Sequence, residues 1–218
     1  MLFTFQEIFD AAAMTFIIGL IFSDFFARYN KKDAKNAGLF VKHGPGQEVA
    51  YDPISHYSSK KKVHLGLLSF DWDDLKFAMM IIGPAIILHE LGHKFTAMGF
   101  GVEATFHTSY FFLGLALLLK ILNSPFIFLV PAFVAYPAGA ISPLQSSLVA
   151  FAGPAVNFLI FIASSLALKF MKKLDKKTIM LLGLTKQVNL FLALFNMIPL
   201  RPFDGGHVLS GILQSIGI

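Results

Sequence analysis

The feature that most constrains this chain is a long apolar run, Leu75–Phe100, that carries polar side chains in its second half. The run exceeds the roughly 20 residues that a helix needs to cross a bilayer. His89, Glu90 and His93 lie inside it. Histidines four residues apart project from one face of a helix. Because polar groups are costly in lipid, such a cluster predicts a functional site.

The five residues from His89 to His93 read His-Glu-Leu-Gly-His, which is an HExxH pattern. Two imidazoles at this spacing can bind one Zn²⁺. Glu90 lies next to His93 around the helix, where it can reach a metal-bound water as general base. The alternative is a pair of histidines that only hydrogen-bond across a helix bundle. The apolar surroundings favour the metal site.

The composition predicts an integral membrane protein. Of the 218 residues, 56% are hydrophobic and 14% are charged, with a mean hydropathy of +0.67. Soluble domains carry about a quarter charged residues. We expect an all-α, polytopic bundle of about 4–6 transmembrane helices in the cell membrane. Because the chain has no cysteine, any zinc must be held by histidine and carboxylate.

The distribution of apolar and charged residues along the chain predicts three parts. Residues 1–26 form a first transmembrane helix, and 27–74 form a polar, lysine-rich extramembrane insert. In that insert, Gln47–Tyr51 and Val63–Phe70 favour short strands. Residues 75–218 form the catalytic membrane core.

The core contains four further apolar runs after the motif helix: Phe106–Leu122, Pro125–Ala140, Ser146–Met171 and Thr178–Leu200. The motif helix and the last run both present polar residues near their C-terminal ends, so we expect them to run parallel, with Ser146–Met171 antiparallel between them. The first two runs must then either both span or both not span.

The net charge of +5 is uneven along the chain. Basic residues concentrate in the 27–74 insert and in the 172–177 loop, which we interpret as a topology signal rather than a nucleic-acid footprint. Glu7 and Asp10, at the start of the first helix, suit the positive end of a helix dipole. Positive loops favour the cytoplasmic side, which by itself would place the catalytic ends of the helices toward the opposite side. The orientation stays open.

A catalytic zinc requires a third protein ligand, and Asp204 is the best-placed carboxylate. Pro199 and Pro202 end the preceding helix. Gly205 and Gly206 let the backbone turn. The sequence therefore predicts that Asp204 lies on a broken, non-helical segment that lines a cavity. The alternative is a C-terminal turn at the membrane surface.

These motifs together resemble the site-2 protease family, the intramembrane zinc metalloproteases of peptidase family M50. The resemblance covers residues 75–207 and rests on three patterns in order: His89-Glu90-x-x-His93, Ala152-Gly153-Pro154-x-x-Asn157, and Asn196-x-x-Pro199-x-x-Pro202-x-Asp204-Gly205. It implies one Zn²⁺ per chain and roles for six side chains: the zinc ligands His89, His93 and Asp204, the base Glu90, and the substrate-binding asparagines Asn157 and Asn196.

The resemblance also implies hydrolysis of peptide bonds within or near transmembrane segments of other membrane proteins. The expected partners are such substrates and the lipid bilayer, with no nucleic acid; the oligomeric state stays open. One alternative is a metalloprotease whose third ligand is a glutamate, for which only Glu103 follows the motif. The other is a membrane metal-ion transporter that uses histidine and aspartate as relay ligands.

Overall fold

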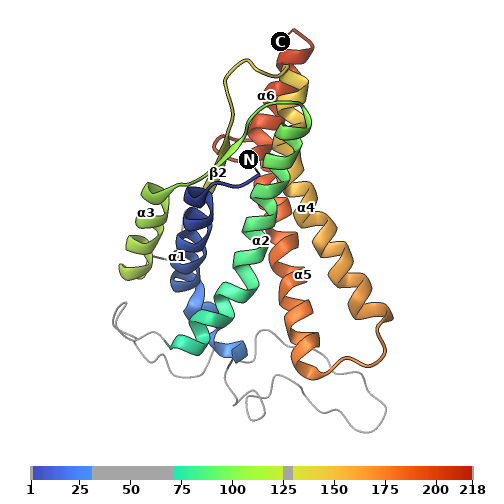
Figure 1. The fold of residues 1–218 in the computed structure, drawn as a ribbon. Helices are drawn as coiled ribbons and strands as arrows, with labels where there is room; N and C mark the ends of the chain where they lie inside the picture. The colour runs from blue at the N-terminus through green and yellow to red at the C-terminus, as the bar shows by residue number, and fades with distance from the viewer. Residues whose placement is uncertain (1, 31–70, 125–129, 218) are drawn as a thin grey trace.

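The computed structural model describes residues 2–30, 71–124 and 130–217. Within them the chain forms six helices and one two-stranded sheet (Figure 1). The elements in order are α1 (Phe5–Asn30), α2 (Trp72–Gly99), β1 (Thr105–Thr108), α3 (Tyr110–Ile121), β2 (Ala132–Ala135), α4 (Pro143–Phe170), α5 (Lys176–Asn196) and α6 (Asp204–Ser215). The strands expected at 47–51 and 63–70 lie outside the described residues.

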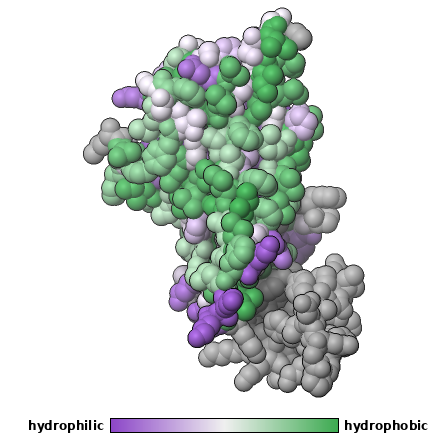
Figure 2. Space-filling model, turned by 90° about the vertical axis from the view of Figure 1, so that its right-hand side faces the viewer, coloured by the Kyte–Doolittle hydropathy of each residue, from purple (hydrophilic) through white to green (hydrophobic). Residues whose placement is uncertain are grey.

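Four helices, α1, α2, α4 and α5, are long and apolar enough to cross a membrane. This confirms the predicted polytopic helical bundle. Helices α2 and α5 run in the same direction and α4 runs opposite to them, as expected (Figure 1). The space-filling view shows apolar side chains over most of the bundle and hydrophilic ones gathered toward its ends (Figure 2).

The region between α2 and α4 bears on the alternative left open for 106–122 and 125–140, and among the described residues neither run forms a spanning helix. It contains the 12-residue helix α3, which is too short to span, between two four-residue strands. The strands pair antiparallel, with Thr105 opposite Ala135 and Thr108 opposite Ala132. Among the described residues no helix of spanning length lies here. Helix α3 lies beside α1, and the pairing of β1 with β2 brings the chain back to the level where it left α2 (Figure 1).

Helix α2 is the centre of the bundle. In its most apolar window 56% of residues are buried, against 17% in α5. Its apolar side chains Ile81 and Ile82 pack in one cluster with Met14 and Ile18 of α1. A central position suits α2 because the polar residues in its second half need partners on several sides.

Two carboxylates of α1 bind polar groups at the end of α2 and on β1. Lys94, 2% exposed, forms an ion pair with Glu7, 5% exposed. Glu7 also accepts a hydrogen bond from the Phe106 N–H of β1, and Asp10 accepts one from the Thr108 N–H. The sequence predicted only a helix-dipole role for these acids. Their pairing instead fixes both α2 and β1 to α1, because a buried charge needs a partner.

We expect Lys94→Met to destabilise the protein by about 3–5 kcal/mol, since it leaves the Glu7 carboxylate buried without its cation. Adding Glu7→Gln to the same chain should recover much of that loss, because the orphaned charge is then removed. Thermal unfolding of both single variants and of the double variant in detergent measures the coupling. Strictly additive losses would contradict a direct pair.

Candidate metal centre

Three side chains converge on one side of α2. His89 and His93 lie one turn apart on this helix, and Asp204 is the first residue of α6. The Nε2 atom of His89 lies 3.1 Å from Asp204 Oδ2 and 3.1 Å from His93 Nε2. His93 Nε2 lies 3.5 Å from the same Asp204 oxygen. Across the described part of the chain, these residues form the one group whose ligand atoms are close enough to share a metal ion.

Asp204 reaches this position through the break between α5 and α6. The non-helical stretch is 197–203, and Asp204 opens α6, where the helix dipole favours a carboxylate. This corrects the expectation that Asp204 itself lies on a non-helical segment. Gly205 does not turn the chain: a Cβ there would overlap the Met197 carbonyl, so this glycine allows α6 to pack closely on the preceding turn.

Hydrogen bonds to α4 fix the orientation of both imidazoles. His93 Nδ1 donates to the Val149 carbonyl at 2.7 Å, and His89 Nδ1 donates to Asn157 Oδ1 at 2.5 Å. Because these oxygens accept, each Nδ1 carries the proton. Each Nε2 therefore presents its lone pair toward Asp204.

Asn157 is fully buried behind His89. Its amide nitrogen donates to the Ala85 carbonyl at 3.0 Å and to Asn189 Oδ1 at 2.8 Å. These contacts hold the side-chain oxygen toward His89. Asn189 was not predicted as a site residue. Its only sequence signal is a polar amide in an apolar span, and spacing alone does not show that it meets Asn157.

Glu90 lies beside the cluster and is 5% exposed. Its Oε2 atom has no hydrogen-bond partner among the described residues. A buried carboxylate oxygen without a partner is unusual in a folded protein. Such an atom suits a group that acts on a molecule entering the site.

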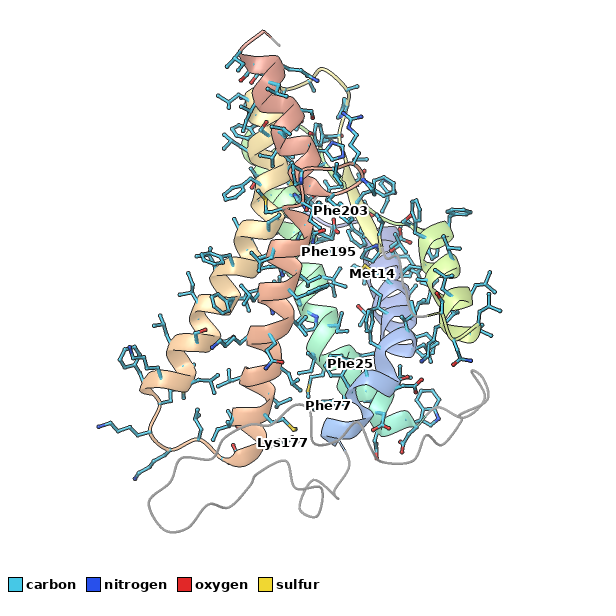
Figure 3. All side chains as sticks on the ribbon, turned by 180° about the vertical axis from the view of Figure 1, so that it is seen from behind. Met14, Phe25, Phe77, Lys177, Phe195 and Phe203 are labelled. Carbon is cyan, nitrogen blue, oxygen red and sulfur yellow. The ribbon has the colours of Figure 1, made fainter. Side chains whose placement is uncertain are left out.

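The cluster opens into a cavity of about 550 Å³ between α1, α2, α5 and β2. His89, Glu90, Asp204 and Asn196 line it, and this volume is typical of a ligand site. Six aromatic rings form much of the remaining wall: Phe22, Phe25, Phe26, Phe191, Phe195 and Phe203. Figure 3 shows Phe195 and Phe203 close together on the α5 side, with Phe25 on α1. The ring centroids of Phe195 and Phe203 lie 4.8 Å apart.

The donor set fits a tetrahedral divalent metal ion such as zinc. Ligand bonds of about 2.0–2.2 Å at tetrahedral angles place the ligand atoms about 3.3–3.6 Å apart, close to the observed 3.1–3.5 Å. Gly153 of α4 faces these atoms. A Cβ at this position would overlap His93 Nε2 and lie 2.7 Å from His89 Nε2. The absence of a side chain at Gly153 keeps the space at the ligand atoms open.

The structure therefore brings together four of the six predicted site residues and places the other two nearby. His89, His93 and Asp204 form the cluster with Glu90 beside it, and Asn196 lines the cavity. Asn157 stands behind His89 rather than on the cavity wall.

Comparison with known proteins gives the family. The family model of peptidase family M50 matches residues 164–217. A relative from Methanocaldococcus jannaschii, named "Putative zinc metalloprotease", is 34% identical over 134 residues, which cover 61% of this chain and 69% of the relative. The chain belongs to peptidase family M50. The resemblance to the site-2 protease family is thereby confirmed.

A second relative, from Synechocystis, is also named a putative zinc metalloprotease. It is 34% identical over 137 residues, which make up 63% of this chain. The matched part spans only 31% of that relative's length. No solved structure matches this M50 chain.

We expect Gly153→Ala to weaken zinc affinity about tenfold or more, because the new methyl group displaces the imidazoles from their common point. Metal analysis of the purified variant after zinc loading measures this. Gly183→Ala on α5 is the matched control, since a Cβ there has no neighbour within 4 Å. Equal zinc content in both variants would show that the space left by Gly153 of α4 is not required for zinc binding.

Proposed function

We propose that this chain is an intramembrane zinc metalloprotease that hydrolyses peptide bonds within or near transmembrane segments of membrane-protein substrates. The observation that carries the proposal is the cluster of His89, His93 and Asp204, which opens with Glu90 into an apolar cavity between potential spans. Membership of a peptidase family supports it, and so do the two relatives named as putative zinc metalloproteases.

In this proposal His89, His93 and Asp204 hold one Zn²⁺ per chain. When bound, zinc supplies Lewis acidity, which makes water acidic enough to lose a proton near neutral pH and polarises a carbonyl group. Asn157 keeps His89 in the required tautomer and orientation, and the Val149 carbonyl does the same for His93.

Glu90 acts as general base. It accepts a proton from water while the water oxygen bonds to the carbonyl carbon of the scissile peptide. It then delivers the proton to the amide nitrogen as the carbon–nitrogen bond breaks. The Oε2 atom, without a hydrogen-bond partner among the described residues, suits this exchange because no neighbouring donor competes for it.

The cavity supports an apolar peptide as substrate. A helical substrate keeps its carbonyl groups in internal hydrogen bonds, so it must unwind before its peptide bond can be attacked. Asn196 lines the cavity and supports the role of binding the freed backbone. The hydrogen-bonding groups of Asn157 are engaged by its neighbours, which favours a role in orienting His89; its binding of substrate stays a prediction.

The proposed setting is the cell membrane, with the chain crossing several times and contacting lipid and transmembrane substrates. The predicted alternative was a metal-ion transporter. A transporter passes an ion between successive ligand groups, whereas the described residues hold one such group. Together with membership of a peptidase family, this favours the protease.

We expect Glu90→Gln to lower the cleavage rate by about 10²–10⁴-fold, because the amide cannot accept the proton. Bound zinc should be unchanged, since Glu90 is not a ligand in this proposal. Cleavage of a panel of single-span substrates in detergent, with parallel metal analysis, measures both. Glu103→Gln makes the same change at an exposed position and should leave both unchanged. Normal turnover by Glu90→Gln would rule out the mechanism.

We expect Asp204→Ala to reduce both bound zinc and cleavage, because it removes the third ligand. Asp175→Ala is the control, as Asp175 is exposed in the α4–α5 turn. There the Thr178 hydroxyl donates to its carboxylate and lowers its pKa. Full zinc content in purified Asp204→Ala would exclude Asp204 as a ligand.

A further inference from the structure

Three amide side chains of α5 lie in contrasting surroundings. Asn189, 1% exposed, donates to the Thr185 carbonyl and accepts from the Asn157 amide. Gln187 and Asn196 line the cavity instead. Neither makes a side-chain hydrogen bond within the part of the chain that the structure describes. Two amides thus retain hydrogen-bonding groups in an apolar span, where unpaired polar groups are costly.

The wall around these amides is otherwise apolar. On α5 the lining residues recur at three- and four-residue spacing, so one helical stripe faces the cavity: Leu184, Gln187, Val188, Phe191, Leu192, Phe195 and Asn196. Apart from the metal-centre residues, Gln187 and Asn196 contribute the polar side chains among the described lining. A ligand that matches this wall has apolar side chains and backbone hydrogen-bonding groups at two separated points.

We propose that the cavity holds the substrate as an extended apolar segment, and that Gln187 hydrogen-bonds to its backbone about four residues from the cleaved bond. This inference rests on the function proposed above. Nine positions separate Gln187 from Asn196, about 13 Å along the helix at 1.5 Å per residue. An extended chain covers about 13 Å in four residues. Asn196 is the last residue of α5, beside the break that leads to Asp204, so Gln187, more than two turns earlier on α5, marks the far end of that segment.

The placement of Gln187 makes recognition depend on unwinding. A helical substrate uses its interior N–H groups and one lone pair of each interior carbonyl in its own hydrogen bonds, so it offers an amide side chain fewer groups than an extended segment. An extended substrate exposes them, and its large apolar side chains can pack on Phe191 and Phe195, whose rings stack with centroids 5.3 Å apart. The substrate class is therefore an apolar transmembrane segment that can extend over at least about four residues.

A set of synthetic single-span peptides tests this inference. Each peptide carries one backbone ester in place of an amide, at successive positions three to five residues from the cleaved bond on either side. An ester lacks the N–H donor and is a weaker acceptor. With the unsubstituted protein, one position should lower kcat/KM by about three- to tenfold, the effect of one lost hydrogen bond. In Gln187→Leu the amide peptide should lose a similar factor, and the ester at that position should cause no further loss.

Gln214→Leu is the matched control, since Gln214 is exposed on α6 and does not line this cavity. It should leave the ester profile unchanged. Zinc content and thermal unfolding of Gln187→Leu should equal those of the unsubstituted protein, which separates recognition from folding. Identical ester profiles for Gln187→Leu and the unsubstituted protein would overturn the role of Gln187 while leaving the protease intact. No zinc-dependent cleavage of any amide peptide by the unsubstituted protein would overturn both proposals.

Discussion

Polar groups that α2 carries into the bundle need partners there, because lipid and apolar side chains offer none, and among the described residues the Oε2 atom of Glu90 is the buried exception. This requirement orders the helices around α2. His89 and His93 hydrogen-bond to α4 through Asn157 and the Val149 carbonyl, and Lys94 pairs with Glu7 of α1. The histidines that carry the proposed chemistry therefore also hold α4 against α2, and Lys94 holds α1 against it.

The two sides of α2 differ as a result. On the α4 side, packing is close: Gly153 admits the imidazoles at short range and Asn157 is fully buried. On the other side, α1 and α5 leave a cavity lined with phenylalanines, and the Nε2 atoms and the Asp204 carboxylate meet at its edge. The closed side fixes the orientation of the imidazoles, and in the proposed function the open side admits the substrate, so the two requirements fall on different sides of α2.

Most of the bundle could be predicted from the sequence, because long apolar runs have one stable form in lipid, the helix. The predicted spans appear as α1, α2, α4 and α5 with small shifts at their ends. The strands β1 and β2 were missed because four residues are too few for a period-two pattern to distinguish a strand from part of a helix or a loop. The roles of Glu7 and Asn189 were missed for another reason: each depends on a partner far away in the chain, Lys94 and Asn157.

The sequence by itself determined the local geometry of the site. Two histidines four residues apart on a helix share one face whatever surrounds them, and two prolines before Asp204 end the preceding helix. Only the tertiary structure decided that Asp204, 115 residues from His89, meets both imidazoles, and that Gln187 faces the cavity while Asn189 faces α4. Local geometry follows from the helix repeat within a few residues. Contacts across the bundle depend instead on how whole helix faces pack, which is a property of the entire chain.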